Sequence, residues 1–150
     1  MNVGAICTRR VAVVERTSTV MAAARRMREE HVGDLVVVGH HDGKLLPVGI
    51  ITDRDIVVGC VARSAEFLEK LLVEDLLVRP LVTATADEDS LLVARRMRER
   101  EVRRIPVVDA NGELTGILSV DDLIGSLHAE LAEIATLLGH QHTHEERMRP

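Results

Sequence analysis

Aromatic residues are almost absent from this sequence, which has one Phe and no Tyr or Trp in 150 residues. Modules that bind single-stranded nucleic acids stack the bases on aromatic rings, so this shortage argues against such a module. Positive charge is also short, because 19 Lys and Arg stand against 24 Asp and Glu, for a net charge of −5. A surface with this balance does not attract the phosphate backbone of a nucleic acid. We therefore expect no nucleic-acid partner.

Cysteine, export signals and long apolar runs are equally scarce. Cys7 and Cys60 lie in apolar sequence without C-x-x-C spacing, and the first residues lack the pattern of an export signal. These features predict free thiols in a reducing cytoplasm. The longest apolar runs, such as residues 35–38, have the length of a strand, so no membrane partner is expected. With 46% apolar and 29% charged residues, the composition is that of a globular protein.

The sequence repeats itself. The six residues Ala-Arg-Arg-Met-Arg-Glu occupy positions 24–29 and again positions 94–99. Gly-Ile-Ile-Thr at 49–52 corresponds to Gly-Ile-Leu-Ser at 116–119, which places three extra residues of the first copy in the loop before residue 49. Two copies indicate a pseudo-symmetric pair, since a solenoid needs three or more repeats.

Each copy is expected to form a β-α-β-β-α unit. Cap-forming polar residues precede a helix with one apolar face, and two strands joined by a glycine turn lead into a second helix. Because neither copy can bury its apolar faces alone, the fold class is predicted to be α/β (α+β), with two repeats packed sheet to sheet and a C-terminal helix. The first-copy segments are 11–14, 20–30, 35–38 and 48–51, and the second-copy segments are 81–85, 93–100, 105–108 and 114–118.

The predicted boundaries follow the repeats. Residues 1–58 form the first repeat, residues 59–72 a linker with a short helix, and residues 73–127 the second repeat. A helical extension covers residues 128–139 and is expected to stop at Gly139. The polar residues 140–150 are expected to be disordered.

The doubled unit resembles the tandem cystathionine β-synthase (CBS) domain pair. Gly-Ile-Ile-Thr-Asp-Arg-Asp at 49–55, Gly-Ile-Leu-Ser-Val-Asp-Asp at 116–122 and Val-Arg-Arg-Ile-Pro-Val-Val-Asp at 102–109 carry the resemblance, which covers residues 3 to 127. It implies a stand-alone regulatory module, without catalytic activity or a required cofactor, that passes its state to a target protein. Its ligands, bound in clefts between the repeats, would contain adenosine: AMP, ADP, ATP, S-adenosylmethionine or NAD.

Two hydroxyl–acid pairs, Thr52 with Asp55 and Ser119 with Asp122, are the candidate ribose-binding residues. The same spacing is that of a helix capping box, and the two roles are compatible. Both pairs lie where a strand ends and a helix begins, and a carboxylate there can accept both hydroxyls of a ribose. The resemblance assigns Asp55 and Asp122 to ribose, and Thr52 and Ser119 to ribose or phosphate.

A nucleotide also needs cations, and the candidates are Arg103 and Arg104. A guanidinium binds phosphate oxygens bidentately. A solvated charge pair is the alternative, but the resemblance implies phosphate contact at these two positions. Arg54 is a further candidate. The first copy has Gly33-Asp34 there, so its cleft is expected to hold a neutral or cationic adenosyl compound, or nothing.

The adenine must be held without aromatic rings, by aliphatic side chains and backbone hydrogen bonds. The resemblance implies that Ile105 and Pro106 flank the base. Leu35 is the corresponding apolar residue of the first copy and is included among the ligand-binding residues.

Metal and catalytic sites are not predicted. The alternating residues His140, His142 and His144 could chelate a transition metal, but an uncommitted polar tail is the favoured interpretation. No nucleophile with an adjacent base emerges, so no catalytic residue is proposed. Two alternatives stay open: a protein–protein interaction scaffold without ligand, and a metal-dependent hydrolase that uses the histidines and the Asp pairs.

An apolar stripe on the last helix predicts a homodimer. One small domain does not cover this stripe, and apolar surface left exposed usually marks an interface. CBS pairs commonly join as dimers, so the resemblance points the same way. The stripe consists of Leu127, Leu131, Ile134 and Leu138.

Overall fold

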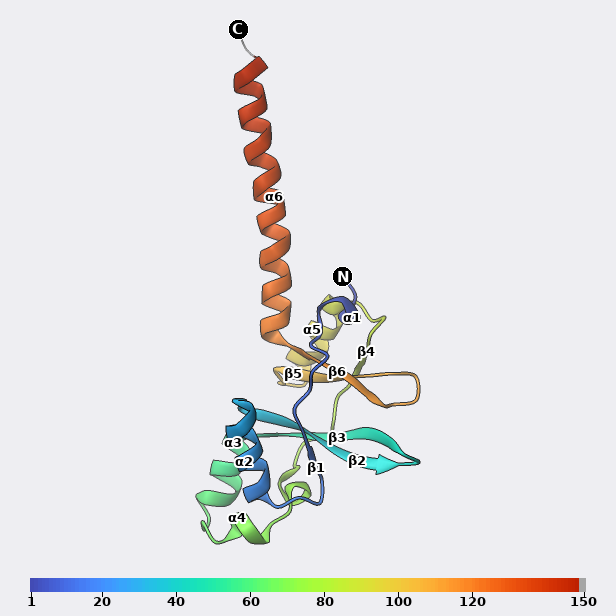
Figure 1. Ribbon diagram of the computed structural model, residues 1–150, viewed down its shortest axis with the longest axis vertical. Coiled ribbons are helices and arrows are strands. Elements are labelled where there is room, and N and C mark those ends of the chain that lie inside the picture. Colours follow the sequence, from blue (N-terminus) through green and yellow to red (C-terminus); the bar gives the residue numbers. More distant parts are fainter. Residues whose placement is uncertain (149–150) are drawn as a thin grey trace.

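Two three-stranded sheets lie one above the other, and a long helix projects away from them (Figure 1). The structure, a computed structural model, describes the backbone of residues 1–148 and the side chains of residues 1–138. In each sheet the middle strand pairs in parallel with the first strand and antiparallel with the third. The predicted fold class is therefore confirmed. The strands are β1 (Val13–Glu15), β2 (Asp34–His41), β3 (Lys44–Thr52), β4 (Ala84–Thr85), β5 (Arg104–Val108) and β6 (Leu114–Ser119).

One helix covers each sheet: α2 (Val20–Glu30) in the first repeat and α5 (Ser90–Glu99) in the second. Both helices begin where a polar side chain, Thr19 or Asp89, accepts hydrogen bonds from backbone N–H groups of the first turn. Each buries a methionine on its apolar face, at positions 27 and 97, and leaves most of its arginines toward solvent. The apolar face thus holds the helix on the sheet.

The strands alternate between two buried environments. On β2, Leu35 and Val37 belong to the core under α2, whereas Val36 and Val38 are fully buried on the opposite face. Successive side chains of a strand point to opposite faces. Val36 and Val38 therefore face the second sheet, and the two repeats are joined by apolar packing between their sheets.

The hairpins differ in length, as the three extra residues of the first copy require. The strands β2 and β3 contain eight and nine residues, whereas β5 and β6 contain five and six. Both turns use a glycine in the left-handed region, Gly43 with φ 74° and Gly112 with φ 79°. Glycine adopts this conformation without steric cost, so the two turns are fixed by sequence.

The repeats exchange their leading segments. The short helix α1 (Val3–Ile6) lies against the second repeat, where Val3 is fully buried and its N–H donates to the carbonyl of Glu88. The 3-10 helix η2 (Val73–Leu76) lies against the first repeat, where Val73 is fully buried in the first core. Each repeat therefore completes its core with a segment that the boundaries 1–58 and 73–127 assign to the other.

Truncation of either exchanged valine is expected to destabilise the repeat across the interface. Val3→Ala and Val73→Ala each remove two buried methyl groups, so each should lower the free energy of unfolding by about 2–3 kcal/mol. Urea denaturation measures this loss. Val58→Ala, at an exposed valine, serves as the control and should change stability by less than about 0.5 kcal/mol. A similarly small effect of Val3→Ala would contradict the exchange.

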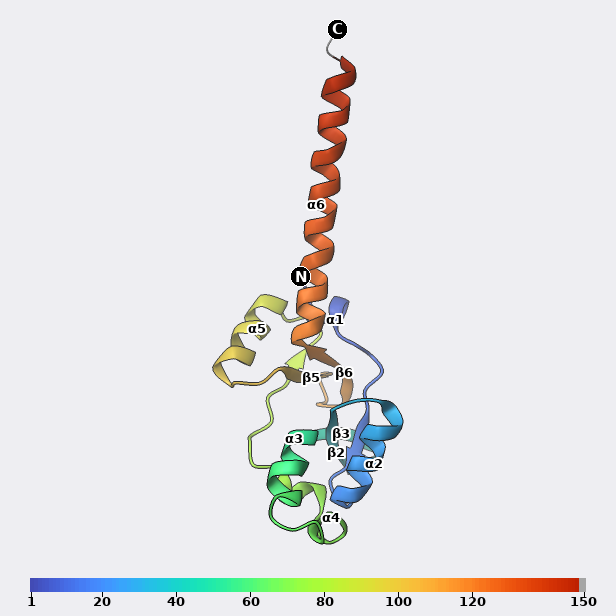
Figure 2. The ribbon, with the colours of Figure 1, turned by 90° about the vertical axis from the view of Figure 1, so that its left-hand side faces the viewer.

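The remaining helices lie at the end of the first repeat, in the linker and at the C-terminus. After β3 the chain forms α3 (Asp53–Ile56), a π-helical turn η1 (Val57–Val61) and α4 (Phe67–Lys70), which packs beside α2. The last helix, α6 (Val120–Met148), stands clear of the sheets for most of its length in both views (Figures 1 and 2). Over residues 1–148, no helix has the length and hydropathy that crossing a membrane requires.

The predicted helix stop at Gly139 is wrong, whereas the disorder expected for residues 140–150 stays a prediction. The α6 backbone continues to Met148. A single glycine inside a helix costs only about 1 kcal/mol relative to alanine, so it ends a helix only when other signals join it. Neither a proline nor a second glycine follows within the next turn, and the helix passes through.

Candidate functional site

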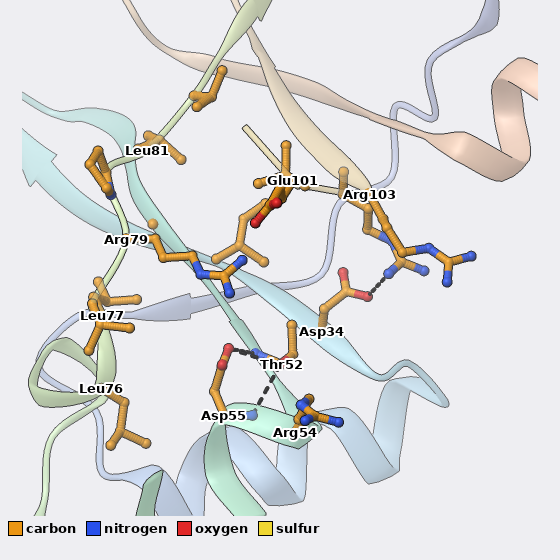
Figure 3. Close-up of a pocket in the computed structure, with 17 residues that line it drawn as sticks. Asp34, Thr52, Arg54, Asp55, Leu76, Leu77, Arg79, Leu81, Glu101 and Arg103 are labelled. Atoms are coloured by element: carbon orange, nitrogen blue, oxygen red, sulfur yellow. Dashed lines mark hydrogen bonds and ion pairs between the residues drawn. The ribbon is translucent and has the colours of Figure 1, made fainter. Parts of the chain in front are cut away.

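A cavity of about 390 Å³ opens between the two repeats. The first repeat contributes Thr52, Arg54 and Asp55, from the end of β3 and the start of α3 (Figure 3). The chain that crosses between the repeats contributes residues 76–82, and the second repeat contributes residues 101–104. We call this space cavity 1. It is lined by both repeats, so a ligand that fills it touches both.

The Thr52–Asp55 pair forms a complete capping box at the start of α3. Asp55 Oδ2 accepts hydrogen bonds from the backbone N–H of Thr52 at 2.9 Å and from its hydroxyl at 2.8 Å, and Thr52 Oγ1 accepts from the N–H of Asp55 at 3.1 Å. Both bonds to the carboxylate use the same oxygen. The capping box therefore fixes the orientation of the carboxylate and leaves Oδ1 outside its hydrogen bonds.

Positive charge predominates among the residues that line cavity 1. Four arginines and three carboxylates line the cavity. Figure 3 shows Arg79 extending from the crossing segment into the middle of the space, above Thr52 and Asp55. The arginines are Arg54, Arg79, Arg103 and Arg104, and the carboxylates are Asp34, Asp55 and Glu101.

A second cavity, cavity 2, has a volume of about 330 Å³ and contains the second hydroxyl–acid pair. Asp122 Oδ2 accepts from the backbone N–H of Ser119 at 2.8 Å and from its hydroxyl at 2.6 Å. Unlike its counterpart in cavity 1, this carboxylate also receives a long hydrogen bond from the Thr8 hydroxyl, at 3.5 Å. The first repeat contributes residues 10–12 and 31–34 to the lining, and the second repeat also contributes Arg104 and Ile117.

Each cavity thus combines the hydroxyl–acid pair of one repeat with the strand start of the other. The sequence analysis assigned Arg103 and Arg104 to the cleft of the second copy, away from Thr52 and Asp55, and for Arg103 this assignment is wrong. The sheets pack face to face with pseudo-twofold symmetry, so the start of the middle strand in one sheet lies beside the end of the third strand in the other. Arg103 therefore lines the cavity of Thr52 and Asp55, whereas Arg104 lines both cavities, and cavity 1 holds more arginines than cavity 2.

Arg104 forms an ion pair within the structure. Its Nη1 lies 2.6 Å from Asp34 Oδ2, and Asp34 and Arg104 line both cavities. Burial raises the pKa of Asp34; the Arg104 charge opposes this shift and the Asp53 charge adds to it. Of the two arginines predicted to bind phosphate, Arg103 is the exposed one and Arg104 is held by a carboxylate.

The residues expected to flank the base are not in the cavities. Leu35, Ile105 and Pro106 are buried within β2 and β5 and line neither space, so this expectation is corrected. Leu35 and Ile105 face the two repeat cores, because they lie two residues from the core residues at 37 and 107. The apolar lining of cavity 1 comes instead from Ile50, Leu76, Leu77, Val78, Leu81, Val82 and Val102.

Sequence reasoning missed Arg79 and Glu101. Arg79 lies in the crossing segment, which the repeat pattern treats as a connection, although it matches Arg9 at the repeat lag of 70. Glu101 ends the α5 region with a left-handed backbone, φ 54°, as His31 does after α2, φ 55°. These equivalent residues line cavity 1 and cavity 2, respectively.

Metal-binding side chains do not cluster in the described part of the chain. Among the described residues, no group of three or more His, Cys, Asp or Glu could hold a metal ion. His140, His142 and His144 lie beyond residue 138, outside the residues whose side chains the structure describes.

Comparison with known proteins matches the chain to the CBS domain. The family model covers residues 3–60 and 73–129. The CBS domain-containing protein YhcV of Bacillus subtilis is 31% identical over 139 residues, which are 91% of this chain and 94% of that protein. An uncharacterized protein of Methanopyrus kandleri is 32% identical over 124 residues, 83% of this chain, and the match spans 61% of the length of that relative.

Solved structures give the same match. A CBS domain protein from Pyrobaculum aerophilum, complexed with AMP, superposes with a TM-score of 0.75 at 26% identity, over 91% of this chain and 99% of that one. A CBS domain pair in complex with 5′-methylthioadenosine and S-adenosyl-L-methionine superposes with a TM-score of 0.73 at 25% identity, over 87% and 98% of the two chains.

Proposed function

The chain belongs to the CBS domain family, and from this premise we propose that it is a regulatory module that binds an adenine nucleotide in cavity 1. One observation carries the proposal: the structure brings the Thr52–Asp55 pair of one repeat into the same cavity as Arg79 and Arg103. A ribose acceptor and phosphate-binding cations are thereby combined. Similar CBS proteins have been solved with AMP and with S-adenosyl-L-methionine, which supports an adenosyl ligand.

The proposed roles follow from the geometry. Asp55 Oδ1, which the capping box does not use, accepts the ribose hydroxyls. Arg79 and Arg103 bind the phosphate, with Arg54 nearby, because guanidinium groups recognise phosphate oxygens. The aliphatic side chains of the crossing segment enclose the base in place of aromatic rings. The cavity of about 390 Å³ has the size of a small-molecule site.

Signalling is proposed to result from the position of the site between the repeats. A ligand shifts a conformational equilibrium only by its different affinity for the two states. A nucleotide bridging Asp55 of one repeat and Arg103 of the other favours the arrangement that holds them together. We propose a cytoplasmic, non-catalytic module that passes this arrangement to a target protein.

Titration with AMP tests this function. Wild-type protein should show saturable binding by calorimetry, and Asp55→Asn should weaken it about 5- to 150-fold, the equivalent of about 1–3 kcal/mol. Asparagine keeps one oxygen for the capping box and replaces the free acceptor with a donor. Asp89→Asn makes the same change at the α5 cap, away from both cavities, and should not alter the affinity. Absence of saturable binding would favour the ligand-free scaffold.

We also propose that the protein forms a homodimer through α6. Five apolar side chains recur on this helix at alternating spacings of three and four residues, and each is between 54% and 65% exposed. Such spacing is typical of helices that pair with one another. A relative of this chain has been solved as a hexamer, so CBS proteins do assemble. The five residues are Ile124, Leu127, Leu131, Ile134 and Leu138.

A further inference from the structure

A single ion pair joins the two cavities. Asp34 and Arg104 line both spaces, and their charged atoms are 2.6 Å apart. They occupy equivalent positions 70 residues apart, and each pairs across its sheet with an equivalent residue, Thr52 or Ser119. Equivalent positions that contact each other lie at the pseudo-twofold axis. One contact at this axis is therefore shared by both sites.

The side chains of Asp34 and Arg104 differ in how freely they can move. The Asp34 side chain is 11% exposed, whereas that of Arg104 is 40% exposed. A long, half-exposed arginine can turn toward a new partner, but a buried carboxylate cannot turn toward water. Burial raises the pKa of Asp34, and the Arg104 charge lowers it. A buried charge that loses its partner is strongly unfavourable unless another cation replaces it.

We propose that this pair couples the cavities: an anionic group in cavity 1 draws Arg104 away from Asp34, and the released carboxylate makes cavity 2 a site for a ligand that carries a positive charge. The inference rests on the proposed function, since it takes cavity 1 as the phosphate site. With Arg104 withdrawn, Asp34 and Asp122 face cavity 2, and Asp53 is close enough to Asp34 to add its charge. Arg10 also lines cavity 2; its side chain is 90% exposed and lies 3.3 Å from Glu30.

The coupling must act in both directions. If an anion in cavity 1 raises the affinity of cavity 2 for a cation by some factor, the cation raises the affinity of cavity 1 for the anion by the same factor. Two different ligands, one with a negative and one with a positive group, would therefore be detected together. Identical residues at the two positions could not do this, because two arginines or two aspartates at the axis would repel each other.

The test uses three adenosine compounds that differ only at the 5′ position: AMP, neutral adenosine and cationic 5′-amino-5′-deoxyadenosine. Calorimetric titration with the amine is run with and without saturating AMP. AMP should raise the affinity for the amine about 5-fold or more, the lower end of typical coupling, and should leave that for adenosine within about 2-fold. Asp122→Asn should weaken binding of the amine, because cavity 2 is the proposed site of the amine.

Variants of the pair separate the charge effect from other causes. Asp34→Asn should remove the preference for the amine over adenosine. Arg104→Gln should give tight amine binding without AMP, and AMP should then add nothing. The double variant Asp34→Asn/Arg104→Gln keeps a neutral hydrogen-bonding pair and should show neither coupling nor a preference for the amine. Thermal melting verifies the fold of each variant. If a single variant fails to fold, the double variant provides the test.

Two results would contradict the coupling, and only one of them would also contradict the proposed function. Saturable AMP binding with an unchanged affinity for the amine, or an equal gain for amine and adenosine, would eliminate the coupling and leave the proposed function standing. Absence of saturable AMP binding would eliminate both.

Discussion

Replacing Arg79 and Arg103 together with glutamine is expected to weaken AMP binding more than about 100-fold and adenosine binding less than about 3-fold. Each charge-assisted hydrogen bond contributes roughly 1.5–3 kcal/mol, so two lost bonds remove about 3 kcal/mol or more. Arg104 is left in place so that the buried Asp34 keeps its ion-pair partner in the variant. The loss should shrink as salt rises, since screening already weakens the wild-type attraction. Calorimetry with both ligands at two salt concentrations measures these effects.

A matched control removes the same charge elsewhere. Arg95 and Arg98 lie exposed on α5 and line neither cavity. The Arg95→Gln/Arg98→Gln variant should retain AMP binding within about 3-fold. An equal loss of AMP and adenosine in the Arg79/Arg103 variant would mean that these arginines act on the fold or the base, and a loss shared with the control would indicate a general electrostatic effect.

The fold was predictable because its signals are local. The caps at Thr19 and Asp89, the glycine turns at Gly43 and Gly112 and the apolar faces of the helices each lie within a few residues of the element that they specify. Because of the internal repeat, each element of the unit is predicted twice, once from each copy. Local signals that agree in two copies leave little room for another order of helices and strands.

The composition of each cavity was not predictable from the sequence. The repeat pattern identifies equivalent residues in the two copies, but it does not show which residues of the other copy they pack against. Arg103 and Asp122 are neighbours within one repeat, yet they line different cavities. The same limit applies to α1 and η2, whose short apolar segments could have packed on either core. Packing between the sheets, which joins distant residues, decides both cases.

The misplacement of Ile105 and Leu35 had a signal in the sequence. Each lies two residues before a valine, Val107 or Val37, and strand alternation puts such pairs on one face. That face packs under a helix in both repeats, so these side chains are fully buried in the cores. The family resemblance outweighed this alternation in the sequence analysis, and the structure favours the alternation.

Replacing Leu131 and Ile134 with glutamate is expected to convert a dimer into a monomer. Both side chains are more than half exposed at the centre of the α6 stripe. Full burial of a Leu or Ile side chain contributes about 1.5–3 kcal/mol, and two chains would each lose two such contacts and bury like charges. Light scattering at micromolar concentration should give twice the chain mass for wild type and one chain mass for the variant.

The matched control adds the same charge to another face of α6. Ala129→Glu/Thr136→Glu places two glutamates at positions outside the three- and four-residue spacing of the stripe, and this variant should remain a dimer. A monomeric wild type would contradict the proposal, as would a control that dissociates like the stripe variant. Helicity gives an independent measurement, because a projecting helix without a partner is only marginally stable in water. Dissociation of the stripe variant should therefore be accompanied by a loss of circular dichroism at the helix band, whereas the control should retain it.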